Sequence, residues 1–125
     1  MQLADIDPAL GLMAELGKLT HGTTRHINQM RQDAIFTEGT VSARLKTLSA
    51  MLWSISSRCE PCIKFYVQKA ATLGATQEEL GEVLAVASTM GGCVGEMWAL
   101  KAFKAYKDYT VGNVAEAPEP SCCVV

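Results

Sequence analysis

Two cysteines in a Cys-x-x-Cys arrangement, Cys59 and Cys62, are the residues of this chain whose types and spacing most clearly allow chemistry. They stand where one amphipathic segment ends and the next begins. In a chain without a recognisable secretory signal, this spacing is typical of thiol–disulfide exchange or of half a metal site. Two helical cysteines three positions apart lie on the same side of the helix, so they can form a disulfide with little backbone movement.

The residues around the pair favour thiolates. The free N–H groups and the positive dipole end of a helix start stabilise a negative charge and lower the pKa of a thiol. Arg58 and Lys64 act in the same direction, whereas Glu60 opposes them. Pro61 fits the first turn of a helix and limits how far the two thiols separate. The position nearest the helix start favours Cys59 as the attacking thiol.

Helical periodicity predicts the elements that must position the pair. We expect six helices, over about residues 7–22, 23–36, 42–57, 61–73, 76–90 and 94–109. Asp7 before Pro8 is a helix start, Gly74 a left-handed helix end, and Thr76 with Glu79 a capping box. The chain is 49% hydrophobic and only 6% aromatic, which suits closely packed helices rather than a β-sandwich. The predicted fold class is therefore an all-α bundle with the Cys-x-x-Cys at a helix N-terminus.

We expect residues 1–110 to form a single helical domain and residues 111–125 a flexible tail. The tail contains a second pair, Cys122 and Cys123, and about 13 extended residues after Tyr109 can reach roughly 40 Å. The tail pair is a candidate mobile dithiol that carries electrons to or from the Cys-x-x-Cys, or a hook for a soft metal. The alternative is a disordered tail with incidental cysteines. Cys93 is expected to pack in the core.

Composition excludes several classes of protein. The formal net charge is −2 with scattered lysines and arginines, so nothing favours nucleic-acid binding. The N-terminus lacks the features of a secretory signal and no apolar run approaches a membrane span, so we expect a cytoplasmic chain with no membrane partner. No glycine-rich nucleotide loop is present, and the cysteine spacing matches no common zinc template, so no cofactor and no metal is expected.

From about residue 41 to 109, the sequence resembles the carboxymuconolactone decarboxylase family, and its cysteine pair brings it nearer the alkylhydroperoxidase D branch. The similar features are Cys59-Glu60-Pro61-Cys62, the run from Ala71 to Leu84, and Met90-Gly91-Gly92. The resemblance implies an all-helical fold assembled as homodimers, homotrimers or homohexamers. It also implies a small peroxide or disulfide as substrate, and a protein or small thiol as electron donor.

Two positions differ from the pattern of that branch, which usually carries a histidine four residues after the second cysteine and a glutamate about twelve before the first. Here these positions are Tyr66 and Thr47, whose hydroxyl groups stay protonated at neutral pH and are not ordinary bases. Disulfide exchange is less affected, because it needs mainly an accessible thiolate and a resolving thiol. Glu60 or Glu96 is a candidate substitute for the missing carboxylate. The proton relay of the branch works on the second thiol, which keeps Cys62 open as the attacking group.

The sequence thus predicts a thiol-dependent oxidoreductase, a peroxidase or a disulfide reductase, that cycles Cys59 and Cys62 between dithiol and disulfide. Tyr66 is the candidate hydrogen-bond partner of a sulfur or of an incoming oxygen. Three alternatives remain: a non-catalytic thiol sensor or metal-binding protein, a lactone decarboxylase-like enzyme, and two cysteines that act only as small buried hydrophobic residues.

Overall fold

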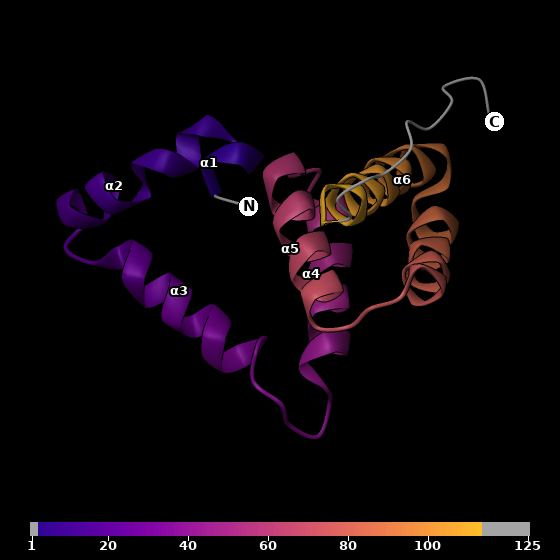
Figure 1. The fold of residues 1–125 in the computed structure, drawn as a ribbon, viewed down its shortest axis with the longest axis horizontal. Helices are drawn as coiled ribbons and strands as arrows, with labels where there is room; N and C mark the ends of the chain where they lie inside the picture. The colour runs from indigo at the N-terminus through magenta and orange to yellow at the C-terminus, as the bar shows by residue number, and fades with distance from the viewer. Residues whose placement is uncertain (1–2, 114–125) are drawn as a thin grey trace.

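The computed structural model describes residues 3–113, and these form helices joined by short turns, with no strand in that range. The elements are α1 (Leu3–Ile6), the 3-10 helix η1 (Pro8–Leu12), α2 (Met13–Leu19), α3 (Thr23–Ala34), α4 (Ala43–Ser56), α5 (Glu60–Thr72) and α6 (Gln77–Asn113). Figure 1 shows their arrangement. The predicted all-α fold class is confirmed.

Helices α4, α5 and α6 pack against one another and contain the main hydrophobic core; we call them the helical body. The core is aliphatic, as the low aromatic content predicts, and no aromatic side chain belongs to its fully buried set. Its members are Leu48, Met51, Ile55, Ile63, Val67, Ala70, Ala75, Leu80, Leu84, Ala99, Ala102 and Ala105.

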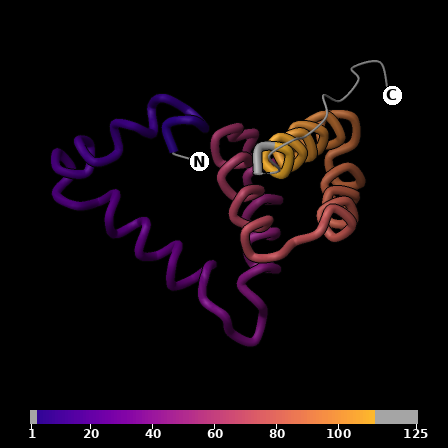
Figure 2. The backbone as a smooth tube through the Cα atoms, viewed as in Figure 1, coloured from indigo at the N-terminus to yellow at the C-terminus, as the bar shows by residue number. Residues whose placement is uncertain are grey.

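The helices η1, α2 and α3 form an N-terminal arm that stands apart from the helical body in both ribbon and tube views (Figures 1 and 2). No residue of the arm is buried, in contrast to the body. The arm is anchored at its two ends. Helix α1 contacts α5, with Ile6 buried, and Phe36, which follows α3, stacks on the rings of Phe65 and Tyr66.

The predicted helix boundaries that rest on capping residues are confirmed. The Asp7 side chain accepts a hydrogen bond of 2.9 Å from the Ala9 amide at the start of η1. Thr76 and Glu79 each accept a hydrogen bond of 3.1 Å from the other's backbone amide, which is the capping box expected at the start of α6. Gly74 has a φ of 97°, the left-handed conformation predicted for the end of α5.

Two boundaries differ from the prediction. The first predicted helix is divided into η1 and α2, and Gly11 lies immediately before the division, where glycine weakens a continuous helix. The fifth and sixth predicted helices are the two halves of α6, separated by a kink at Gly92, where φ is 59° and ψ is −142°. The break is where the sequence places it, but helical structure resumes without a loop, and α6 continues past Tyr109 to Asn113.

Helix α6 is long and apolar enough to cross a membrane, by length and composition alone. The candidate stretch, Gln77–Val111, contains the kink at Gly92, so its two halves point in different directions (Figure 1). Gly95 lies close to the first half: a Cβ atom built on it would overlap the carbonyl oxygen of Ala87. Helix α6 is therefore bent at Gly92, and its two halves lie close together beside the kink.

Candidate active site

The backbone of Cys59 is held by the end of α4 and the start of α5 together. Arg58 lies in the left-handed region, with a φ of 57°, and its amide donates to the carbonyl of Ile55 over 3.0 Å. The Cys59 amide donates to the carbonyl of Ser54, also over 3.0 Å. These two bonds form a Schellman motif, in which arginine takes the place usually occupied by glycine. Cys59 is at the same time the N-cap of α5.

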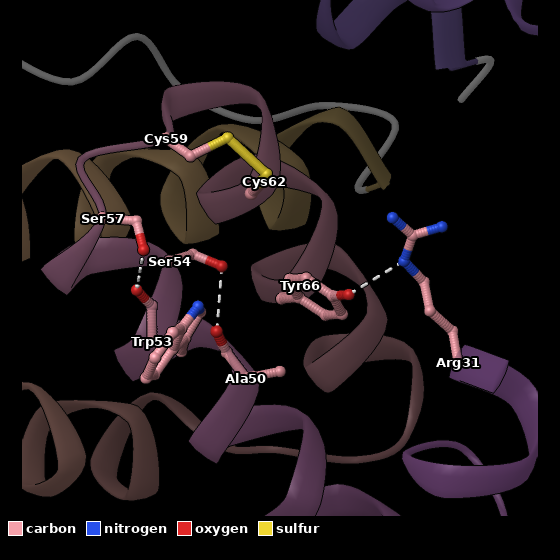
Figure 3. Close-up of a disulfide and its surroundings, with 8 residues drawn as sticks. All are labelled: Arg31, Ala50, Trp53, Ser54, Ser57, Cys59, Cys62 and Tyr66. Atoms are coloured by element: carbon pink, nitrogen blue, oxygen red, sulfur yellow. Dashed lines mark hydrogen bonds between the residues drawn. A yellow bond between two sulfur atoms is a disulfide. The ribbon is translucent and has the colours of Figure 1, made fainter. Parts of the chain in front are cut away.

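Cys59 and Cys62 form a disulfide within the first turn of α5 (Figure 3), and their Cα atoms are 5.3 Å apart, in the usual range for disulfides. Both residues are partly buried. An N-cap side chain usually accepts a hydrogen bond from the second or third helical residue. Here the second is Pro61, which has no N–H, and the third is Cys62 itself. In the disulfide form, the Cys59 side chain makes no such capping hydrogen bond.

Tyr66 lies one turn after Cys62 and connects α5 to the arm. Its hydroxyl oxygen accepts a hydrogen bond of 3.2 Å from Nε of Arg31, and Nη1 of Arg31 donates over 2.6 Å to Oδ1 of Asn28 (Figure 3 shows the Arg31–Tyr66 bond). Because the phenol oxygen already accepts from Arg31, its own proton remains available for donation. Sequence reasoning missed Arg31, since it belongs to the polar side of a helix that periodicity assigns to the surface.

A cavity of about 100 Å³ lies between α5 and the arm, and Cys62 is the cysteine that lines it. Three polar side chains share this lining with the thiol: Tyr66, Arg31 and Asn28. The remaining walls are apolar, formed by Leu3, Leu10, Met13, Pro61 and Phe65. Two larger grooves, of about 630 Å³ within the arm and about 490 Å³ between α4 and α6, are lined by neither member of the cysteine pair, although Arg58 borders the second.

The charges around the disulfide are unevenly neutralised. Glu60 pairs with Lys64 on the surface of α5, with a separation of 3.7 Å and both side chains well exposed. Arg31, by contrast, pairs with no carboxylate among residues 3–113. The cavity beside Cys62 therefore carries a positive charge that no carboxylate of residues 3–113 balances, which favours an anion that enters.

The other predicted site residues lie away from this cavity. Thr47 is fully buried, and its hydroxyl donates over 2.8 Å to the carbonyl of Ala43 in the same helix. Glu96 is exposed on α6. Cys93 is an exposed free thiol, so its predicted place in the core is wrong: it follows the kink at Gly92 and faces outward.

The tail pair, Cys122 and Cys123, lies outside the described residues. Within the part of the chain that the structure describes, no group of three or more His, Cys, Asp or Glu side chains is arranged to hold a metal ion.

Comparison with known proteins defines the class to which this fold and site belong. The model of the carboxymuconolactone decarboxylase family matches residues 22–105, and the chain belongs to that family. The crystal structure of a carboxymuconolactone decarboxylase family protein from Legionella pneumophila, in its apo form, is similar with a TM-score of 0.78 and 28% identity. The similarity covers 86% of this chain and 96% of that one.

An uncharacterized protein of Cupriavidus necator is 39% identical over 71 residues, which are 57% of this chain. The match spans 62% of the length of that relative.

Proposed function

We propose that this protein is a thiol-dependent oxidoreductase of the alkylhydroperoxidase D-like branch, which exchanges disulfides through Cys59 and Cys62. The observation that carries the proposal is the cavity that Cys62 shares with Tyr66 and Arg31. A thiol at a helix start, within disulfide distance of a second thiol, has what exchange requires.

In the proposed cycle, the Cys62 thiolate attacks one sulfur of a small disulfide. The S–S bond of the substrate breaks, one thiolate leaves, and a mixed disulfide forms on Cys62. The Cys59 thiolate then attacks the Cys62 sulfur, the second substrate thiolate leaves, and the pair becomes oxidised. Two electrons pass from the pair to the substrate, and a protein or small-thiol donor returns them. In this cycle, Tyr66 donates a hydrogen bond to a leaving thiolate.

Peroxide reduction is the weaker of the two reactions in this proposal. Cys62 would attack an oxygen, an alkoxide would leave, and Cys59 would condense with the resulting sulfenic acid and release water. The leaving alkoxide needs a proton. The two positions that relay protons in the branch are occupied here by Tyr66 and Thr47, and the Thr47 hydroxyl already donates to a carbonyl of its own helix. We therefore expect disulfides to be turned over faster than peroxides.

The test is turnover of a neutral small disulfide, 2-hydroxyethyl disulfide, with dithiothreitol as donor. Cys59→Ser is expected to accumulate one mixed disulfide on Cys62, seen by mass spectrometry. Cys62→Ser is expected to lose the reaction, and steady-state turnover falls about a thousandfold or more in both variants. Cys93→Ser is the matched control and should turn over normally. Turnover that survives in Cys62→Ser, or stoichiometric oxidation without turnover in the intact protein, would refute the proposal; the second result would favour a thiol sensor.

Family membership also allows a lactone decarboxylase-like activity. That reaction does not depend on a cysteine pair, so activity on a lactone that persists in Cys59→Ser and Cys62→Ser would favour it.

The proposed cycle needs a reducing compartment, and we propose the cytoplasm as its location. We further propose that the protein assembles with copies of itself. Five large apolar side chains of α6 are between 48% and 82% exposed, on both sides of the kink: Val86, Met90, Val94, Met97 and Leu100. Large exposed apolar side chains, of which Val86, Met90 and Val94 line one groove, are typical of contacts between proteins.

A further inference from the structure

Arg31 is the feature of the site that disulfide exchange alone does not explain. Its side chain is partly buried, it reaches from α3 to the hydroxyl of Tyr66 on α5, and no carboxylate of residues 3–113 neutralises it. A guanidinium has five N–H groups, of which two donate to Tyr66 and Asn28, so three make no hydrogen bond within residues 3–113. A planar fork of free donors is the usual partner of a carboxylate.

The cavity around Arg31 has two chemically different ends. Its polar lining consists of Arg31, Asn28 and Tyr66, together with the sulfur of Cys62. The rest is apolar, from Leu3, Leu10, Met13, Pro61 and Phe65. Figure 3 shows the Tyr66 hydroxyl pointing toward Arg31 on α3, while the cysteine pair lies one turn earlier on α5. The cavity lining thus contains both the sulfur of Cys62 and the guanidinium. A molecule that touches both needs a reactive sulfur at one end, a short apolar link and an anion at the other.

We propose that Arg31, positioned by Asn28 and Tyr66, binds the carboxylate of the substrate, so that the protein acts on small carboxylated disulfides. This inference rests on the proposed disulfide exchange and adds the substrate class. The volume of about 100 Å³ is below the roughly 300–1,000 Å³ of pockets for drug-sized ligands, so it favours a short organic acid over a larger molecule. The carboxylate supplies the negative charge that Arg31 otherwise lacks, and the link lies along Met13 and Phe65.

The simplest substrate of this class is 3,3′-dithiodipropionate, in which two methylene groups separate each sulfur from its carboxylate. The Cys62 thiolate attacks the nearer sulfur, 3-mercaptopropionate leaves, and Cys59 then releases the second 3-mercaptopropionate from the mixed disulfide. The pair loses two electrons and the substrate gains two, and dithiothreitol restores the dithiol.

The experiment compares this diacid with its diamide, which has the same disulfide and almost the same size but no charge. The full-length protein carries serine at Cys93, Cys122 and Cys123, so that only the pair reacts. Single-turnover rates for the two disulfides are divided by the rates of 2-mercaptoethanol with the same compounds, which removes their intrinsic difference in reactivity. The normalised diacid preference is expected to be about tenfold or more, the range of a charged hydrogen bond.

Arg31→Gln is expected to abolish the normalised diacid preference, because it should lower the diacid rate about tenfold more than it lowers the diamide rate. Arg31→Lys, which keeps the charge but not the fork, should retain part of the preference. In the protein that retains Arg31, raising the salt concentration should reduce the preference for the diacid. If Arg31 only ties the arm to α5, Arg31→Gln will slow both compounds equally. That result, or a normalised preference of one, would overturn the proposal.

Binding without chemistry separates this inference from the proposed function. Octanedioate, which has methylene groups in place of the two sulfurs, should shift the Arg31 Nε–H resonance of the oxidised protein, whereas octanediamide should not. If octanedioate binds but neither disulfide reacts faster than with 2-mercaptoethanol, the carboxylate site stands and the redox function fails. If both disulfides react equally and octanedioate does not bind, the redox function stands and the carboxylate site fails.

Discussion

The helical body and the N-terminal arm contribute to the candidate site in opposite ways. The body supplies the cysteine pair on a helix that is packed against two others, and the main hydrophobic core belongs to it. The arm has no buried residue, yet its α3 supplies Arg31 and Asn28. In the proposed function, the reacting thiols thus lie on the part that contains the main core, and the groups proposed to bind the substrate carboxylate lie on the part with less packing to hold it.

Mutations in the two regions should therefore affect different properties, which are the folding free energy and the substrate selectivity. Changes in the body should appear first as loss of folding free energy, because they remove packed contacts. Changes in the arm should appear first in selectivity, because few of its side chains are withdrawn from water.

The largest expected effect on folding comes from Leu80→Ala in the body. Leu80 is fully buried, so the change should lower the unfolding free energy by about 2–5 kcal/mol. The matched change in the arm is Leu16→Ala, where 55% of the residue is exposed and the expected change is within about 0.5 kcal/mol. Urea unfolding measures both. Equal losses would show that the arm is as tightly packed as the body.

A smaller effect is expected from adding one methyl group to a glycine in each region. Gly95→Ala places a Cβ atom against the carbonyl oxygen of Ala87, and the two halves of α6 must separate, at a cost of about 1–3 kcal/mol. Gly17→Ala in α2 meets only ordinary contacts with Thr24, so the gain in helix propensity should stabilise the protein by up to about 1 kcal/mol. Thermal unfolding distinguishes the two. A neutral Gly95→Ala would mean that α6 tolerates a wider kink.

Replacing an exposed methionine with glutamate should have the smallest effect on the unfolding free energy of the single chain. Its expected effect is on assembly. Met97→Glu on α6 should dissociate the proposed assembly, because a carboxylate would be buried at the contact, whereas Met30→Glu on the arm should leave it intact. Light scattering gives the mass of each. A chain that is monomeric before any substitution would refute assembly, and loss of assembly in Met30→Glu alone would transfer the contact to the arm.

The sequence was sufficient for the parts of the molecule that depend on local interactions. The capping box of Thr76 and Glu79, the left-handed Gly74 and the break at Gly92 each follow from residue types within a few positions. The placement of Arg31 could not be predicted in this way. It depends on how the arm approaches α5, a contact 35 residues apart in the chain, and helical periodicity carries no information about it.

The predicted burial of Cys93 was wrong for a related reason. Its apolar neighbours predict burial, but much of the apolar surface of α6 around the kink faces outward instead of toward the core. Periodicity identifies an apolar face and does not say which molecule covers it.

Cys59 belongs both to the end of α4 and to the start of α5, and this limits where the chain length can change among related proteins. Since one residue both completes the hydrogen bonds that end α4 and caps α5, an insertion or deletion between Ser54 and Ile63 would break one cap or the other. Length differences among close relatives should therefore gather in the connections at residues 35–42 and 73–76, while the distance in sequence from α4 to the cysteine pair stays constant.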